Sequence, residues 1–419
     1  MRTININPAP RRVLLIAIVI VLAIAHWFIG VWGFGNIVST RADRPEIADF
    51  AVDLAPGDPQ THYAAAVLYD RTLVTADQQR SLSEYEKAVT LSPNNYLLWL
   101  EYGKALERSG DPSRAESSLK HALELAPNYA AVHWALGNLE VRKGETDTGF
   151  EQIRAAVEGN PEYAGSAASF AYQYFDGDLG QVRNVVGTSP RANAALAVLL
   201  AKQKRFDEAA TVWQVIDQPA KDDSITAVGR LLVNELISAK KFARAMNVDS
   251  TLDPGSASAA EMVRDGGFED AIKLEGASPF DWLIEQGAQP QVLQSTSQPH
   301  SGSRSLVLRY TSNDGNGLRA ISQTVIVRTN TRYTLGGFYH SDLKADGKLV
   351  WQISDAASGT IISELPLAIA TSWTPFSVNF QAPADSDGVV LRLTVKACGA
   401  ALCPVSGSVW LDDIELRSN

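Results

Sequence analysis

Residues able to do chemistry are few in this chain, and none of them forms a recognisable catalytic set. The six histidines are scattered, and His26 lies inside an apolar run. Asp412 and Asp413 are adjacent carboxylates, but alternation along a strand sends neighbouring side chains to opposite faces. The phosphate-binding, dinucleotide-binding, zinc-protease and serine-hydrolase motifs are missing from the sequence. We therefore expect a protein that is not an enzyme.

The two cysteines of the chain, Cys398 and Cys403, lie close together near the C-terminus. Outside the cytoplasm such a pair can form a disulfide, worth roughly 2 kcal/mol by loop-closure reasoning. A zinc site would need two more thiol or imidazole ligands nearby, and the chain after His340 supplies none. The sequence therefore predicts a disulfide in an oxidising compartment.

An apolar segment near the N-terminus is long enough to cross a membrane. Residues 13–34 carry no charge, and a helix needs ~20 residues to span a bilayer. Arg2, Arg11 and Arg12 precede the segment, which favours a cytoplasmic stub over residues 1–12. The alternative is a cleaved signal peptide, but its apolar region is usually only about 7–15 residues long, and no A-x-A-like site follows. We expect a single-pass anchor in a bacterial inner membrane, with the folded domains in the periplasm.

Helical patterning over residues 42–248 repeats every 34 residues, as the prolines at 93, 127 and 161 show. Proline ends a helical unit, and a glycine allows two helices to approach closely. Three further columns keep the same step: Ala88, Ala122 and Ala156; Gly103 and Gly137; and Tyr85, Leu119 and Ile153. Each column has a packing role, so these residues are expected in the core.

The phased columns resemble the tetratricopeptide-repeat family, whose pattern is W-x2-L-G-x2-Y…A-x3-F…A…P. Residues 99–127 and 133–161 match it best, and residues 63–93 match with a two-residue insertion near residues 75–79. Later units are degenerate, and residues 177–190 break the period. The resemblance implies a right-handed superhelix whose concave face binds a protein or peptide. The acidic balance of this region gives either a groove for basic ligands or a solvated outer surface.

Beyond a small-residue linker at residues 249–261, the pattern changes from helical to strand-like. Turn signals separate the strands, which predicts an antiparallel β-sandwich (jelly roll) over residues 262–419. The fold class is thus multidomain α + β: a transmembrane helix, an α-helical solenoid and a β-sandwich. Six strands are expected, at residues 305–310, 321–327, 333–339, 349–353, 376–380 and 389–395.

Landmarks of the predicted sandwich resemble carbohydrate-binding modules of the galactose-binding-like fold. They are the segments 265–269 (DGGFE), 300–306, 373–380 and 410–414 (WLDDI). The resemblance implies a structural Ca²⁺ held by Glu269 and Asp412, with backbone carbonyls near residues 301–303 as further ligands. The alternative is that both carboxylates accept hydrogen bonds from backbone amides.

The same resemblance implies a glycan site built on aromatic side chains. Tyr339 and Trp351 are the candidates for stacking on sugar, with Gln352 and His340 as hydrogen-bonding neighbours. For both aromatic residues a place in the core stays open as the alternative. Three other tryptophans lie at family landmarks and are expected in the core: Trp282, Trp373 and Trp410.

The net charge of -10 and the lack of a basic stripe argue against nucleic-acid binding. We expect an extracytoplasmic scaffold or adaptor anchored in the membrane, with a protein or peptide at the repeats and polysaccharide or protein at the sandwich. By analogy, the setting is surface polysaccharide assembly or export. The alternatives are a glycan-binding receptor whose repeats act as a spacer, and an assembly factor whose sandwich has lost sugar binding.

Overall fold

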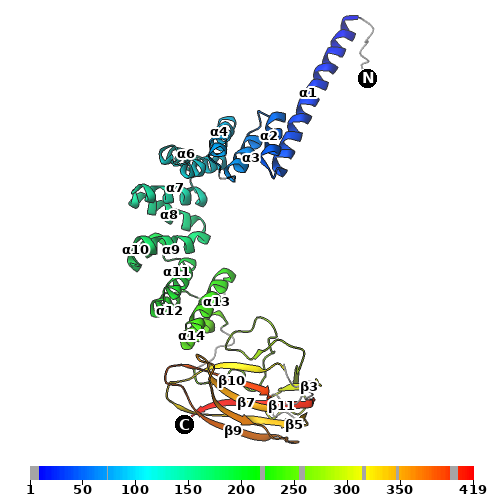
Figure 1. Cartoon of the computed structure of the whole chain (residues 1–419), viewed down its shortest axis with the longest axis vertical. Coiled ribbons are helices and arrows are strands. Elements are labelled where there is room, and N and C mark those ends of the chain that lie inside the picture. Colours follow the sequence, from blue (N-terminus) through cyan, green and yellow to red (C-terminus); the bar gives the residue numbers. More distant parts are fainter. Residues whose placement is uncertain are drawn as a thin grey trace, which may run out of the picture. The chain divides into compact units, whose positions relative to one another are not determined.

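The computed structural model describes residues 9–72, 74–217, 222–253, 260–313, 318–345, 349–396 and 404–419. The chain divides into two compact units, Met1–Gly187 and Thr188–Asn419. The first unit is built of helices, and the second joins helices α11–α14 to a β-sandwich (Figure 1). The division therefore falls inside the predicted solenoid, because its last helices group with the sandwich.

Helix α1 (Ala9–Arg41) contains the predicted anchor. The most apolar stretch of residues 12–41 has a mean hydropathy of 2.8, and none of that stretch is buried. By length and composition α1 can cross a membrane, and within the described residues it alone passes that test. Its last turns differ, because Ser39 is buried and Asn36 donates a 2.7 Å hydrogen bond to Asp58. The helix thus begins as an exposed apolar segment and ends inside a folded core.

Helix α2 (Pro45–Leu54) packs against the end of α1. A Cβ atom on Gly35 would lie 2.9 Å from the Cβ of Ala55 and 3.2 Å from the carbonyl oxygen of Ala51. Ala48 and Ala51 have no exposed surface. Small residues on both helices therefore allow this close approach.

Helices α3–α10 form the repeats of the first unit, two helices to a repeat (Figure 1). Polar side chains cap several helix N-termini; Asp58, for example, accepts the N–H of Gln60. The predicted insertion lies in α4, which has 17 residues against 14 in α6 and in α8. The helices are α3 (Pro59–Asp70), α4 (Thr75–Leu91), α5 (Tyr96–Arg108), α6 (Pro112–Leu125), α7 (Ala130–Lys143), α8 (Thr146–Gly159), α9 (Ala164–Tyr174) and α10 (Leu179–Val186).

The predicted repeat columns lie in the core of this unit. A Cβ atom on Gly137 of α7 would lie 2.7 Å from the carbonyl oxygen of Gly149 in α8. Glycine at position 137 thus lets the two helices of one repeat touch, as the sequence predicts. The other columns are almost fully buried: Ala88, Ala122, Ala156, Tyr85, Leu119 and Ile153.

Two further helix pairs open the second unit, and the last helix contacts the sandwich. The linker predicted over residues 249–261 begins too early, because Asp249 lies within α14 and is buried. Residues 254–259 lie outside the described residues. The helices are α11 (Pro190–Lys202), α12 (Phe206–Gln214), α13 (Asp223–Ser238) and α14 (Phe242–Leu252).

The sandwich consists of two antiparallel sheets. One has the strand order β1-β4-β10-β7-β8, and the other has the order β2-β3-β11-β5-β9 with β6 beside β11. The six strands expected from the strand pattern are all present, β11 contains the landmark segment 410–414, and β1, β2, β6 and β8 were not expected. The strands are β1 (Leu283–Ile284), β2 (Gln291–Ser295), β3 (Ser305–Ser312), β4 (Ile321–Ile326), β5 (Arg332–Ser341), β6 (Lys344–Ala345), β7 (Leu349–Asp355), β8 (Ile361–Pro366), β9 (Thr374–Gln381), β10 (Gly388–Val395) and β11 (Val405–Ser418).

Candidate functional site

The two aromatic side chains expected to stack on sugar lie in the sandwich core. Trp351 has no exposed surface, and Tyr339 is 5% exposed, with its hydroxyl donating a 3.0 Å hydrogen bond to the Ala368 carbonyl. On β5 every second residue from Tyr333 onward is buried, which directs Tyr339 inward. The prediction that these two residues bind a ligand is wrong, and the alternative of core positions holds.

The two polar neighbours expected beside them lie on different sheets. Gln352 is on β7 and donates a 2.7 Å hydrogen bond to Glu364. His340 is on β5 and is partly exposed on the outer face of the other sheet. Gln352 is partly exposed as well, so both residues stay predicted ligand contacts, but on different sheets.

The outer face of the sheet that contains β5 and β11 carries five rings, each in contact with at least one other. His340 stacks on Trp410 with ring centroids 4.2 Å apart, and His300 stacks on Phe338 at 3.7 Å. Trp373 meets both imidazoles edge-on, at 4.7 Å from His340 and 5.6 Å from His300. All five side chains are at least partly exposed. We call them the aromatic platform.

Backbone geometry places these rings. Phe338 and His340 alternate with buried residues along β5, and Trp410 lies opposite His340 on β11. Trp373 precedes β9, and its Nε1 donates a 3.2 Å hydrogen bond to the Gln298 carbonyl. Burial holds the pKa of His340 below its ordinary value, so this imidazole is neutral at pH 7.

Of the three landmark tryptophans expected in the core, only Trp282 is there. Trp282 is 6% exposed, and its Nε1 donates to the carbonyl of Asp265. Trp373 and Trp410 are partly exposed and belong to the platform. Their expected place in the core is wrong. On β11 the neighbours of Trp410, Val409 and Leu411, take the inward positions, and Trp373 lies before the first residue of β9.

The adjacent carboxylates of β11 both reach the turn at residues 300–301. Asp412 accepts the backbone N–H groups of His300 and Ser301, and Asp413 accepts from His300 Nδ1 and Ser301 Oγ, both at 2.6 Å. Regular alternation fails here, because Asp413 has a φ of 52° and the register with β5 shifts between Asp412 and Glu415. The expectation that the two carboxylates point to opposite faces of the strand is therefore wrong. Ser301 Oγ donates to Asp413 and not to an imidazole, so these residues do not form a nucleophile–base pair.

The predicted calcium ligands, Glu269 and Asp412, are both held by hydrogen-bond donors. Glu269 accepts from the N–H of Ser303 at 2.7 Å, from its hydroxyl, and from the N–H of Arg304. These bonds hold the pKa of Glu269 below its ordinary value, the Ser303 hydroxyl foremost. Both oxygens of Asp412 also accept backbone N–H groups. Because N–H groups repel a cation, this arrangement does not fit Ca²⁺ unless the donors move, and the ion stays a prediction.

The predicted disulfide cannot be compared with the structure. Cys398 and Cys403 both lie outside the described residues. The oxidising compartment that the pair implies therefore stays a prediction as well.

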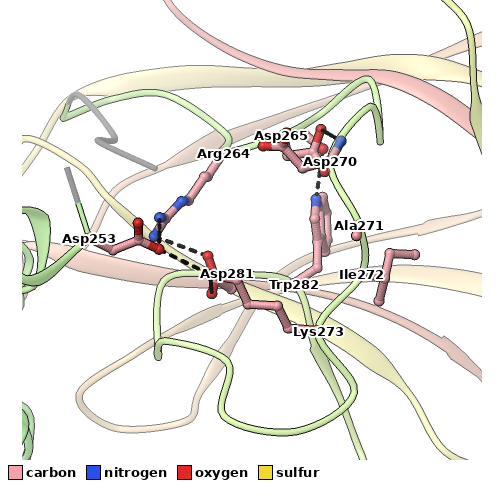
Figure 2. Close-up of a pocket in the computed structure, with 9 residues that line it drawn as sticks. All are labelled: Asp253, Arg264, Asp265, Asp270, Ala271, Ile272, Lys273, Asp281 and Trp282. Carbon is pink, nitrogen blue, oxygen red and sulfur yellow. Dashed lines mark hydrogen bonds and ion pairs between the residues drawn. The ribbon is translucent and has the colours of Figure 1, made fainter. Parts of the chain in front are cut away.

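A pocket of about 380 Å³ opens beside the C-terminal end of α14 (Figure 2). Arg264 lies 3.0 Å from Asp281 and 3.7 Å from Asp253, and Lys273 lies 3.1–3.2 Å from the same two carboxylates. Burial raises the pKa of Asp265, on the opposite wall, to about 6. Arg264 and Lys273 pair with carboxylates inside the pocket. We therefore infer that these ion pairs hold the end of α14 against the sandwich. Its lining residues are Asp253, Arg264, Asp265, Asp270, Ala271, Ile272, Lys273, Asp281 and Trp282.

Partly exposed aromatic rings also occur in successive repeats of the first unit. Tyr96 contacts Tyr129 edge-on at 4.8 Å, and Trp134 stacks on Tyr163 at 5.0 Å. Tyr129 is 40% exposed, and Leu97 beside Tyr96 is 44% exposed. Tyrosine and tryptophan often dominate protein interfaces. We call these four rings the aromatic ladder, and they are the candidate surface for a protein or peptide. The sequence analysis did not identify them, because the family pattern does not include their positions.

Comparison with known proteins identifies the repeats. Residues 97–139 match the family model of the tetratricopeptide repeat. None of the curated proteins matches the chain. Among solved structures, PilF of Pseudomonas aeruginosa is 18% identical and covers 55% of this chain and 93% of its own, with a TM-score of 0.30. The predicted repeats are thus confirmed by the family model and by the paired helices.

Solved carbohydrate-binding modules are also similar to part of the chain. A CBM4 module is 13% identical over 38% of this chain and 99% of its own, with a TM-score of 0.29. The xylan-binding CBM22-1 domain of Xyn10C from Paenibacillus barcinonensis is 16% identical over 39% of this chain and 97% of its own, with a TM-score of 0.27. The chain thus combines tetratricopeptide repeats with an antiparallel β-sandwich.

Proposed function

We propose that this chain is a membrane-anchored scaffold outside the cytoplasm, whose sandwich binds a glycan and whose repeats bind a protein or peptide. The observation that carries the proposal is the aromatic platform. Flat aromatic surfaces stack on the apolar faces of sugar rings, and a few polar atoms beside them fix the orientation. The imidazoles of His300 and His340 supply such polar atoms. The proposal assigns no catalytic step and places the scaffold, by analogy, in surface polysaccharide assembly or export.

The rigidity of the platform supports this role. Phe338, His340 and Trp410 stand on neighbouring strands whose backbones are paired. His300 is held at its backbone by Asp412 and at its ring by Asp413. A surface that is ordered before binding loses little conformational entropy when a ligand arrives, which favours affinity.

The end of α1 supports an anchor over a cleaved signal peptide. Asn36 bonds Asp58, and Gly35 lies against Ala55, so the last turns of α1 belong to the core of the first unit. Cleavage between the apolar stretch and residue 41 would remove part of that core. We therefore propose that α1 stays in the mature protein, with residues 1–12 in the cytoplasm of a bacterium and the repeats and the sandwich in its periplasm.

The glycan part of the proposal is tested by affinity electrophoresis of the full chain in detergent, through gels that contain xylan or β-1,4-galactan. We expect Trp373→Ala and Trp410→Ala each to weaken binding by roughly fivefold or more. Ile361→Ala is the matched control, because Ile361 is 50% exposed on β8 of the other sheet. If the wild type migrates as in an empty gel, or if both tryptophan variants bind as the wild type does, glycan binding at the platform is rejected.

The protein part is tested by chemical crosslinking in intact membranes. A partner at the aromatic ladder is expected to give a crosslinked product that Trp134→Ala abolishes. Leu91→Ala, which changes a side chain 43% exposed on α4, should leave the product unchanged. If glycan binding holds but no product depends on the ladder, the glycan-binding receptor with the repeats as a spacer replaces the scaffold.

A further inference from the structure

Three carboxylates from neighbouring helices meet at a place that the proposed function does not use. Glu116 lies in α6, Glu140 in α7, and Glu145 directly before the first residue of α8. One oxygen from each lies within 4.8 Å of the others, and the rest of the described chain holds no second such group of His, Cys, Asp and Glu side chains. Carboxylates this close repel one another unless positive charge lies between them.

Two lysines supply part of that positive charge. Lys120 donates to Glu116 at 2.5 Å, and Lys143 donates to Glu116 and, at 2.8 Å, to Glu145. Neither lysine forms an ion pair with Glu140 in the described part of the structure. Three carboxylates thus share two ammonium groups, and the cluster keeps a net negative charge.

Glu140 is the member whose bonding is incomplete. It is 4% exposed, and its Oε2 has no hydrogen-bond partner among the described residues. Burial also raises the pKa of Glu140 above its ordinary value. A buried carboxylate oxygen without a partner costs free energy, because burial removes its hydrogen bonds to water and no protein donor replaces them. A cation bound beside it would remove that cost.

We propose that Glu116, Glu140 and Glu145 bind a divalent cation, with Ca²⁺ as the best fit. A set made only of carboxylates suits Ca²⁺, Mg²⁺ or Mn²⁺, whereas zinc sites usually include nitrogen or sulfur ligands. Ca²⁺ accepts irregular arrangements of roughly 6–8 oxygens, while Mg²⁺ demands a near-ideal octahedron. The cation competes with Lys143, whose side chain is 25% exposed and can turn toward solvent. Binding would tie α6, α7 and α8 together across two repeats.

The test is isothermal titration calorimetry of the full chain in detergent, stripped with a chelator and titrated with CaCl₂. We expect Glu140→Gln to weaken binding by at least about tenfold, because a neutral amide replaces a charged ligand. Lys143→Met should strengthen binding, because it removes the competing ammonium group. Glu101→Gln is the matched control, since Glu101 pairs with Lys104 away from the cluster and should leave the affinity unchanged.

Three outcomes would overturn the proposal. The wild type could take up no Ca²⁺ at roughly 1 mM, which is the weak end of protein calcium sites. Glu140→Gln could bind as tightly as the wild type, or binding could be lost only in Glu269→Gln, which would place the ion in the sandwich. Thermal melting without calcium checks that Glu140→Gln folds. Glu145→Gln, at a side chain 46% exposed, is a second variant that carries little risk to folding.

Discussion

Asp387, in the sandwich, accepts a 3.2 Å hydrogen bond from the backbone N–H of Phe242, the first residue of α14, across 145 residues of sequence. Its other oxygen accepts the next N–H of that helix, also at 3.2 Å. A carboxylate at a helix N-terminus satisfies free N–H groups and faces the positive end of the helix dipole. Further along α14, Asp249 accepts a 2.6 Å hydrogen bond from the Ser278 hydroxyl. The last helix is thus joined to the sandwich at two places.

Removal of this cap should loosen α14. We expect Asp387→Ala to lower the free energy of unfolding of the second unit by about 1 kcal/mol, the usual effect of losing an N-terminal cap. Hydrogen–deuterium exchange of the full chain should show faster exchange over residues 242–252. Asp385→Ala is the control, because Asp385 is exposed and only two residues away. Unchanged protection of α14 in Asp387→Ala would show that the cap does not hold the helix.

The repeats could be predicted because each column has a packing or bonding role that recurs. Trp99 Nε1 donates a 2.7 Å hydrogen bond to the carbonyl of Pro93, and His133 Nε2 lies 2.8 Å from the carbonyl of Pro127. The repeat position of Trp99 and His133 requires a ring N–H that donates to this carbonyl, and both tryptophan and histidine supply one. The chemical role thus survives a change of residue, and the 34-residue phasing stays visible.

The aromatic platform could not be predicted, because alternation defines two faces of a strand but not which face is inside. Tyr339 and His340 are neighbours on β5, and both residue types occur in cores and at surfaces. Around Trp410 the strand is apolar at three successive positions, so its pattern does not choose a face either. Asp412 is buried although it is paired with Phe338, because the turn at residues 300–301, far away in the sequence, covers it. Such choices are made by tertiary contacts and leave no local signal.

A buried pair links α3 to α4 and should make the stability of the first unit depend on pH. His62 Nδ1 is hydrogen-bonded to Glu84, and Nε2 lies 2.9 Å from the carbonyl of Pro56. The bond to Glu84 raises the pKa of His62 above 6.5. Burial alone would raise the pKa of Glu84, but hydrogen bonds from His62 and Lys87 outweigh it and hold that pKa below 4.5.

The sign of the effect follows from these shifts. The contribution of His62 is fully present below pH 6.5 and is lost as the pH rises through its raised pKa. The contribution of Glu84 is present above pH 4.5 and is lost as the pH falls through its lowered pKa. We expect Glu84→Gln to cost about 3 kcal/mol near pH 6 and less near pH 9, measured by thermal melting of the full chain. Glu86→Gln, at an exposed side chain of the same helix, should cost little at either pH. An equal loss at both pH values would contradict a charged pair.

Two glycines of the repeats should respond in opposite directions to the same substitution. Gly137→Ala would bring a Cβ atom to 2.7 Å from the backbone oxygen of Gly149, which cannot move without shifting α8. We expect a loss of about 1–3 kcal/mol, the usual cost of overpacking. Gly165→Ala, in α9, meets nothing within 4 Å and should stabilise its helix by up to about 1 kcal/mol. If the melting temperature of Gly137→Ala does not fall, close contact at Gly137 is contradicted, and if that of Gly165→Ala falls, the open space at Gly165 is contradicted.

The junction of α1 with the first unit can decide between an anchor and a cleaved signal peptide. Gly35→Leu would drive a side chain into Ala55 and Ala51, whereas Gly33→Leu meets nothing within 4 Å. We expect Gly35→Leu to loosen the end of α1, so that a protease added to opened membrane vesicles cuts near residues 42–44 faster than in the wild type. Gly33→Leu should resemble the wild type, and both variants should keep the full mass of the chain. If signal peptidase removes α1, the mature protein lacks both glycines, the two variants behave identically, and the mass falls by that of the missing helix.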